Sequence, residues 1–217
     1  MRFELTLLLF GIVVQFGFAQ NKTVLLKHYT AQQGLSDNQV TCMLRDKQGF
    51  MWIGTKDGLN RFDGREFYVF RHDVNNPSSI GANYITSLAC DNDSVLWVGT
   101  ASAGFCAFDF RTQKFTTYNK QHAGIKSNNI NVIRFDKLRN LIWIGYNNGG
   151  MQLFDVRTRK LNGLYNVSGN STYDIFLSDT MAYVATIVNS LKKVSSPNAF
   201  KKHKDITQAA ITINCIV

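Results

Sequence analysis

The chain has 217 residues, of which 45% are hydrophobic and only 18% are charged. With two prolines and sixteen glycines, this composition excludes a disordered tail, a collagen-like fibre and a disulfide-stapled mini-protein. The formal charge is +9, and the basic residues near the end of the chain come as the isolated pairs Lys192–Lys193 and Lys201–Lys202. Such pairs predict a solvated face, and we expect no nucleic-acid binding by this chain.

Residues 1–19 have the pattern of a secretory signal peptide. Arg2 gives a short basic start, and residues 5–18 form an apolar run. Gly17 and Ala19 are the small residues at positions −3 and −1 of a cleavage site before Gln20. The run is short for a transmembrane helix, which needs about 20 apolar residues, so an uncleaved anchor is the weaker alternative. We therefore expect cleavage between Ala19 and Gln20 and a periplasmic or exported chain.

The next segment, residues 20–30, is predicted to contain a leading strand, because residues 24–29 are strand-like but precede the first repeated unit. In closed ring folds made of such units, a leading strand commonly pairs with the last unit. Residues 31–217 then form the repeated part of the chain.

The repeated part has a period of 45–46 residues. A Trp-[Ile/Val]-Gly tripeptide recurs three times, beginning at Trp52, Trp97 and Trp143. An Asn-x-[Val/Ile] tripeptide lies upstream of each, beginning at Asn38, Asn83 and Asn128, and a Phe-Asp pair lies downstream of each, ending at Asp63, Asp109 and Asp155. Because many positions keep phase over three copies, chance is a poor explanation.

Each unit contains four short strand-like segments separated by turn residues. The expected strands are 40–46, 51–55, 59–63 and 67–71 in the first unit, 84–90, 95–100, 104–110 and 114–119 in the second, and 131–136, 141–146, 151–155 and 160–165 in the third. Four antiparallel strands in about 45 residues match one blade of a β-propeller. The predicted fold class is therefore all-β, an incomplete β-propeller of four-stranded antiparallel blades.

A fourth unit is less regular. Its expected strands are 172–177, 181–186, 190–194 and 200–204, and Tyr183 begins the segment that replaces the Trp-Ile-Gly motif. The predicted blades span residues 36–73, 81–120, 126–165 and 170–204, with 205–217 as the start of a fifth. We expect an open arc of blades, because the fourth unit lacks the tryptophan and glycine that would shape a closing contact.

The repeated residues have structural explanations. The tryptophans Trp52, Trp97 and Trp143 are expected to be buried between neighbouring blades. The glycines Gly54, Gly99 and Gly145 would permit a close approach or a bulge. The aspartates Asp63, Asp109 and Asp155 are interpreted as turn formers, although a ring of ligand-binding carboxylates is the alternative. Their regular repetition favours the turn, because a binding site usually breaks symmetry.

The cysteines and histidines do not predict a metal site or a cofactor. Cys42, Cys90, Cys106 and Cys215 show no CxxC pair, and the first three are expected to be small apolar residues of strands. The four histidines are scattered without a HxxxH or HxH pair (His28, His72, His122 and His203).

The run of residues 34–64, Gly-Leu-Ser-Asp-Asn-Gln-Val followed by Asp-Lys-Gln-Gly-Phe-Met-Trp-Ile-Gly-Thr-Lys-Asp-Gly-Leu-Asn-Arg-Phe-Asp-Gly, resembles the start of two-component regulator propellers. Residues 67–73, 76–80 and 83–85 continue the match. The resemblance covers about residues 24–165 and weakens over 166–217. It points to the extracytoplasmic sensor of the hybrid two-component systems with which gut bacteria detect glycans.

This resemblance implies more than the chain contains. Members of the family are similar in carrying two seven-bladed propellers, a β-sandwich domain, a membrane helix, a histidine kinase, a receiver and a DNA-binding helix-turn-helix, and the last four are not readable here. The chain resembles the signal peptide and about four blades, as a truncated sensor would. For a full-length relative, the resemblance implies an anchor in the inner membrane, an oligosaccharide ligand, partnership in cis with the remaining blades and downstream sensor domains, and a possible homodimer.

The function favoured by the sequence is a periplasmic ligand-sensing propeller region. A stand-alone exported module for carbohydrate binding or scaffolding is the alternative. An enzyme is not expected, because after the signal peptide Glu66 is the single glutamate and no catalytic pair is visible. Ligand-binding residues stay unassigned, since most of the aromatics that could stack on a sugar are expected to pack blades (Tyr29, Tyr68, Tyr84, Tyr118 and Tyr146).

Overall fold

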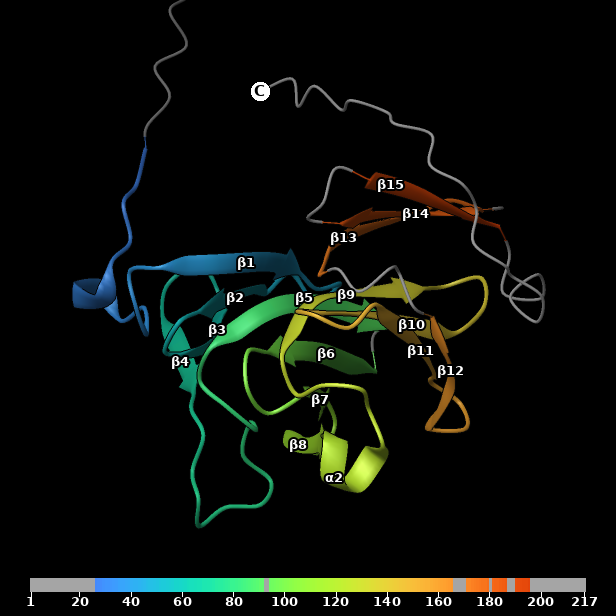
Figure 1. The fold of residues 1–217 in the computed structure, drawn as a ribbon. Coiled ribbons are helices and arrows are strands. Elements are labelled where there is room, and N and C mark those ends of the chain that lie inside the picture. The colour runs from blue at the N-terminus through green and yellow to red at the C-terminus, as the bar shows by residue number, and fades with distance from the viewer. Residues whose placement is uncertain (1–25, 92–93, 166–170, 180, 187–189, 196–217) are drawn as a thin grey trace, which may run out of the picture.

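The computed structural model describes residues 26–91, 94–165, 171–179, 181–186 and 190–195. Within them the chain is nearly all β, with four antiparallel sheets and two short helical turns, η1 (Ala31–Gln33) and α2 (Lys120–Ala123). Strand order in each sheet follows the chain, so every sheet is a simple meander (Figure 1). The all-β propeller fold predicted from the sequence is confirmed.

We call the four sheets blades 1 to 4. Blade 1 contains β1 (Val40–Arg45), β2 (Met51–Thr55), β3 (Gly58–Phe62) and β4 (Phe67–Phe70). Blade 2 contains β5 (Ile85–Asp91), β6 (Val95–Thr100), β7 (Phe105–Asp109) and β8 (Lys114–Tyr118). Blade 3 contains β9 (Ile130–Asp136), β10 (Leu141–Tyr146), β11 (Met151–Asp155) and β12 (Lys160–Tyr165), and blade 4 contains β13 (Thr172–Leu177), β14 (Met181–Thr186) and β15 (Ser190–Ser195). These bounds lie within one residue of the predicted strands.

The leading segment differs from its prediction. Residues 26–30, the described part of the expected leading strand, form no strand. The ring of Tyr29 instead packs edge-on against Phe62 and Phe67, at 5.0 and 5.7 Å between ring centroids. Thr30 then forms a capping box at the start of η1, which turns the chain away from an extended course. The predicted signal peptide with its cleavage site, the strand 200–204 and the segment 205–217 lie outside the described residues.

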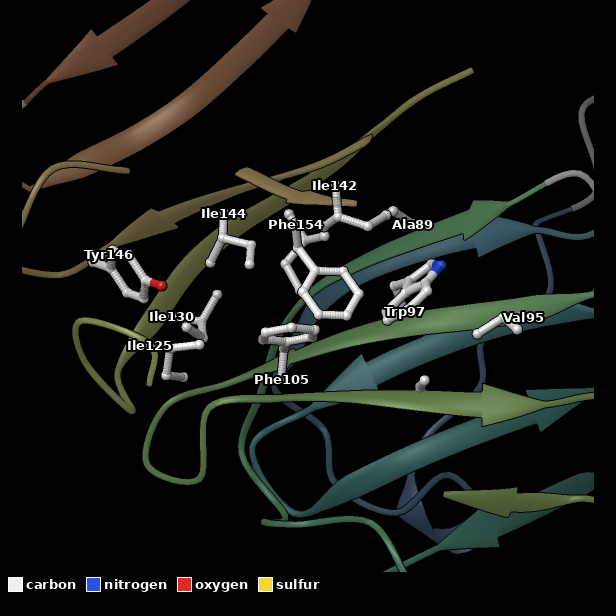
Figure 2. Packing of buried hydrophobic residues seen from close by; sticks show 12 residues of the cluster. Ala89, Val95, Trp97, Phe105, Ile125, Ile130, Ile142, Ile144, Tyr146 and Phe154 are labelled. Carbon is white, nitrogen blue, oxygen red and sulfur yellow. The ribbon is translucent and has the colours of Figure 1, made fainter. Parts of the chain in front are cut away.

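Each of blades 1 to 3 packs one face onto the next blade. The tryptophans Trp52, Trp97 and Trp143 occupy the same position on the second strand of their blades, so their side chains point to the same face of each blade. They are 0, 0 and 2% exposed, as the sequence predicts. Trp97 contacts Phe154 of blade 3 at 5.5 Å between ring centroids, in a cluster that also holds Ile142 and Ile144 (Figure 2). The seams between blades are therefore the hydrophobic cores of the molecule.

The repeated glycines allow the first strands of adjacent blades, which we call the inner strands, to come close. A Cβ atom on Gly54 would lie 2.6 Å from Cys42 Sγ and 2.7 Å from Ile85 Cγ2, a residue of blade 2. Opposite each glycine the pairing skips one residue of the inner strand, as at Thr41 in β1. The Thr41 hydroxyl then donates a 2.7 Å hydrogen bond to the Ile85 carbonyl across the seam.

The blades form an arc. The inner strand of each blade contacts that of the next, from β1 to β5, β9 and β13. In Figure 1, blade 1 and blade 4 lie at the two ends of this row, as the sequence favours. In the described part of the chain, no helix is long and apolar enough to cross a membrane.

Candidate functional site

The internal repeat helps to locate a site. Positions that hold blades together recur from blade to blade, whereas a ligand site needs groups that differ. The recurring polar residues are therefore expected to serve the fold, and a ligand site is expected at exposed positions on the same loops whose side chains do not recur.

One recurring group was not singled out from the sequence. The aspartates Asp46, Asp91 and Asp136 accept hydrogen bonds from the indole Nε1–H of the tryptophan in their own blade, at 2.7, 3.1 and 3.3 Å. Each also accepts a backbone N–H that follows its own strand: from the turn before the second strand at Phe50 and Arg139, and from Val95, which opens the second strand. These carboxylates therefore serve the fold. Their regular spacing of 45 residues was the available signal.

The aspartates of the Phe-Asp pairs hold turns, as interpreted from the sequence. Each Oδ1 accepts two backbone N–H bonds of 2.7–2.9 Å from the residues two and three positions ahead. These bonds lower the carboxyl pKa of Asp63, Asp109 and Asp155, mainly through the N–H groups of Glu66, Thr112 and Thr158.

We expect this arrangement to make stability fall in acid. A folded-state pKa below the ordinary aspartate value, about 3.9, gives stability that is present above that value and is lost as the pH falls through the lower folded-state pKa. Urea unfolding between neutral and acidic pH measures the effect. A variant with Asp63, Asp109 and Asp155 all changed to Asn keeps the acceptor atoms but cannot titrate there, and should lose less stability on acidification. Equal losses would contradict this assignment.

Among the described residues, the cysteines are not arranged for chemistry. Cys42 and Cys90 are half-buried and Cys106 is buried. Burial raises the pKa of the Cys42 and Cys106 thiols, which disfavours the reactive thiolate. The described part of the chain contains no group of three or more His, Cys, Asp or Glu that could hold a metal ion. Cys215 and His203 lie outside it.

The structure separates the five tyrosines considered as sugar-stacking residues. Tyr29 packs on blade 1, Tyr118 stacks on Phe105 at 4.9 Å, and Tyr146 is buried with its hydroxyl bonded to Gln152. Two rings remain exposed. Tyr68 is 56% exposed on the outer strand β4, and Tyr84 is 40% exposed immediately before the inner strand β5.

Tyr84 belongs to a set of residues that we call the upper rim. In each of blades 1 to 3, one backbone hydrogen bond joins the turn after the second strand to the residue just before the first strand. The donors are Lys56, Ala101 and Asn147, and the acceptors are Gln39, Tyr84 and Asn129, at 3.0–3.3 Å. The backbone arrangement thus repeats, while the donor side chain and the acceptor side chain each change from blade to blade.

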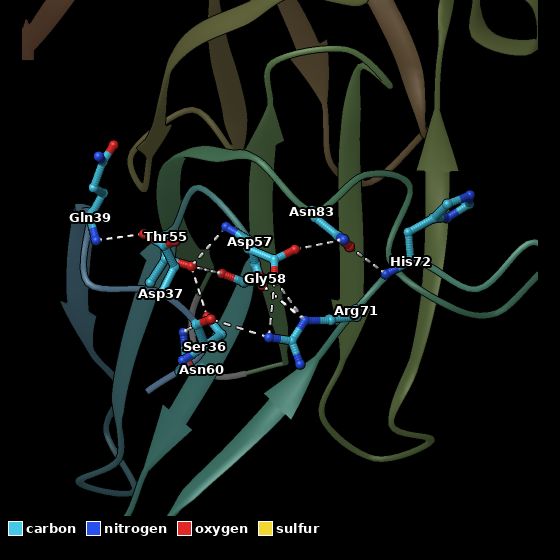
Figure 3. A network of polar contacts seen from close by, with 10 residues as sticks. All are labelled: Ser36, Asp37, Gln39, Thr55, Asp57, Gly58, Asn60, Arg71, His72 and Asn83. Carbon is cyan, nitrogen blue, oxygen red and sulfur yellow. Dashed lines mark hydrogen bonds and ion pairs between the residues drawn. The ribbon is translucent and has the colours of Figure 1, made fainter. Parts of the chain in front are cut away.

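A polar network supports the rim between blades 1 and 2 (Figure 3). The Asp57 carboxylate pairs with Arg71 at 3.1 Å and accepts a 3.0 Å bond from Asn83 Nδ2. Arg71 also donates to the Ser36 carbonyl, and Asn83 Oδ1 accepts the His72 N–H at 2.7 Å. These bonds fix the β2–β3 turn to the chain that enters blade 2.

The upper rim between blades 1 and 2 can therefore recognise a polar ligand. The Lys56 ammonium lies 5.8 Å from the Tyr84 ring centroid, which places a cation beside an exposed aromatic surface. Asp57 and Arg71 are each about half exposed, so both retain polar atoms that face solvent. An aromatic ring with a few fixed polar groups is the usual composition of a ligand-binding surface.

Comparison with known proteins agrees with the fold and the repeat. Residues 34–57 and 79–102 match the family model described as the two component regulator propeller. Each matched segment begins in the loop that enters a blade and ends just beyond its second strand. The resemblance inferred from the sequence is confirmed for these two segments, which are similar to two-component regulator propeller repeats.

Three individual proteins show how far the similarity extends. Histidine kinase P4 of Formosa agariphila is 42% identical over 62 residues, which are 29% of this chain and 4% of that protein. The extracellular domain of a hybrid two-component system from B. thetaiotaomicron has a TM-score of 0.70 and 27% identity, over 78% of this chain and 25% of that one. The computationally designed Ika4 protein, at 17% identity and a TM-score of 0.57, shares the fold over 79% of this chain and 95% of its own. The chain thus spans a small part of both natural relatives.

Proposed function

We propose that this chain is the ligand-recognising propeller region of a two-component regulator, exported to the periplasm. The proposal is supported by the matched family, by the extracellular location of the similar solved domain and by the histidine kinase among the relatives. In a full-length relative, further blades and sensor domains in cis would carry the signal to a kinase on the other side of the inner membrane. Recognition at this end would then be the contribution of the present chain.

We further propose that the ligand is an oligosaccharide bound at the upper rim. The observation that carries this proposal is the break in symmetry at the rim, which leaves the Tyr84 ring exposed beside Lys56. The preceding residue, Asn83, bonds to the Asp57 carboxylate that pairs with Arg71. The C–H face of a sugar ring can pack on an aromatic side chain, and its hydroxyl groups can bond to carboxylate, guanidinium and amide groups. The rim offers both kinds of contact side by side.

A glycan panel tests this proposal. We expect a Tyr84→Ala variant to lose roughly tenfold or more in affinity for any glycan that the chain binds, which corresponds to about 1.4 kcal/mol or more at a central aromatic contact. The matched control is Tyr68→Ala, which removes a still more exposed ring, 56% against 40%, from the outer strand and should leave affinity unchanged. Isothermal titration gives both affinities, and the urea midpoint checks that each variant is folded.

Three results would contradict the proposal in different ways. If no glycan binds, the oligosaccharide ligand is wrong. If Tyr68→Ala weakens binding as much as Tyr84→Ala, the ligand does not lie at the upper rim. If the chain releases products from a bound glycan, its role is not recognition alone.

A further inference from the structure

The carboxylates of the upper rim network are already bound by groups of the protein (Figure 3). One oxygen of Asp57 pairs with Arg71 at 3.1 Å, and the other accepts a hydrogen bond from Asn83. Asp37 Oδ1 accepts the backbone N–H of Gln39 at 2.6 Å. The acidic side chains of this network therefore serve to hold the rim together, and Arg71 offsets the charge of Asp57.

Lys56 is the cation of this rim that has no acidic partner. Its side chain is exposed, and within the described residues no carboxylate lies at ion-pair distance from its ammonium. The neighbour of the ammonium is instead the Tyr84 ring, whose centroid is 5.8 Å away. Two backbone bonds fix the turn that carries Lys56, from its own N–H to the Gln39 carbonyl and from the Gly58 N–H to the Asn83 carbonyl. The stem of Lys56 thus starts from a defined position relative to the ring.

The equivalent positions at the seam between blades 3 and 4 hold a pair that satisfies itself. Asn147 follows the second strand of its blade as Lys56 does, and Ser171 precedes the first strand of the next blade as Tyr84 does. The Ser171 hydroxyl donates a 2.8 Å hydrogen bond to Asn147 Oδ1. Between blades 1 and 2 the same two places hold a full positive charge and an aromatic ring, which attracts the cation but carries no opposite charge. This pair therefore leaves a positive charge open to a ligand.

We infer that the oligosaccharide bound at the upper rim is acidic, and that Lys56 binds its carboxylate or sulfate group. This inference rests on the proposed function. A sugar ring packed on Tyr84 brings a charged substituent close to the ammonium beside that ring. Hydrogen bonds between charged partners are roughly twice as strong as those between neutral ones, so an acidic sugar gains affinity over its neutral form. Lys56 is then the residue that selects the charge of the ligand.

Pairs of oligosaccharides that differ only in charge test this inference by isothermal titration. Oligogalacturonate is compared with its methyl ester, which lacks the carboxylate charge, and a sulfated galactan oligosaccharide is compared with its desulfated form. We expect the chain to bind at least one acidic member tenfold or more tightly than its neutral partner. That binding should weaken as salt is added, because salt screens exposed charges. The pair that shows the preference distinguishes a carboxylate from a sulfate ligand.

Variants at Lys56 test whether this residue causes the preference. In Lys56→Gln, the acidic member should bind no more tightly than its neutral partner and should depend less on salt, whereas affinity for the neutral partner stays unchanged. Lys56→Arg keeps the charge and should retain the preference. The matched control is Lys137→Gln, which removes an exposed lysine from the β9–β10 turn, at the opposite end of the blades from the upper rim. The urea midpoint verifies that each variant is folded.

The outcomes separate this inference from the proposed function. If a neutral oligosaccharide binds as tightly as every acidic one, the acidic ligand is wrong, and the sugar site itself still stands if Tyr84→Ala weakens that binding. If the acidic preference persists in Lys56→Gln, or if this variant loses acidic and neutral ligands alike, Lys56 does not select the charge and the inference is overturned. If no oligosaccharide of either kind binds, the inference and the oligosaccharide ligand fail together.

Discussion

A Trp97→Ala substitution should lower the free energy of unfolding by about 3–5 kcal/mol, the usual cost of removing a large aromatic side chain from a packed core. The indole is fully buried in the seam between blades 2 and 3, where it contacts Phe154 at 5.5 Å and Phe105 at 6.0 Å between centroids. Its removal leaves a cavity on both sides of the seam and takes one donor from the buried Asp91 carboxylate. Urea denaturation followed by tryptophan fluorescence and circular dichroism gives the difference.

Two further variants separate the contribution of aromatic packing from that of the hydrogen bond to Asp91. Trp97→Phe keeps an aromatic ring in the seam but removes the bond to Asp91, so we expect a smaller loss, roughly 1–3 kcal/mol, for a buried acceptor that loses its donor. Tyr68→Ala removes an exposed ring and should change stability by no more than about 0.5 kcal/mol. If Trp97→Ala cost no more than Tyr68→Ala, the seam would not depend on the repeated tryptophan.

The blade architecture could be predicted because its determinants are local and occur several times. Alternating apolar residues mark each strand, turn residues separate the strands, and the spacing of Trp52, Trp97 and Trp143 identifies equivalent strands. Three copies of one pattern reduce the ambiguity that a single short strand would leave. The same redundancy explains why even the fourth blade, which has Tyr183 at the tryptophan position, was placed within one residue at its described strands.

The leading segment shows where local pattern fails. Residues 24–29 have strand-like composition, but a strand forms only when another strand offers its hydrogen bonds. The sequence does not say which edge is available, and Tyr29 instead packs on Phe62 and Phe67. Whether this single, unrepeated segment pairs with a distant strand therefore could not be predicted from the sequence.

The candidate site needed the structure for a similar reason. Tyr68 and Tyr118 both lie on the fourth strand of a blade, yet only Tyr68 is exposed, because the Tyr118 ring stacks on Phe105 inside a seam. Whether a tyrosine can meet a ligand depends on which side chains of the adjacent blade cover it. The upper rim became visible only when the repeated backbone bonds showed that Tyr84 and Gln39 occupy equivalent places with different side chains.

Alanine at Gly145 should destabilise the chain by about 1–3 kcal/mol, because the added methyl group overpacks the seam between blades 3 and 4. Its Cβ would lie 2.6 Å from both Thr172 Cγ2 and Val132 Cγ1. The backbone of Gly145 does not adopt a conformation that requires glycine. In open space the change to alanine would therefore stabilise the protein, because it reduces the conformational entropy of the unfolded chain.

Gly149→Ala is the matched control, since its Cβ would meet only flexible or distant atoms, beginning with Lys126 Cγ at 3.3 Å. Hydrogen exchange should show faster opening of β13 and β14 in Gly145→Ala, with blades 1 and 2 unchanged, and wild-type exchange in blade 4 would show that the seam does not require glycine.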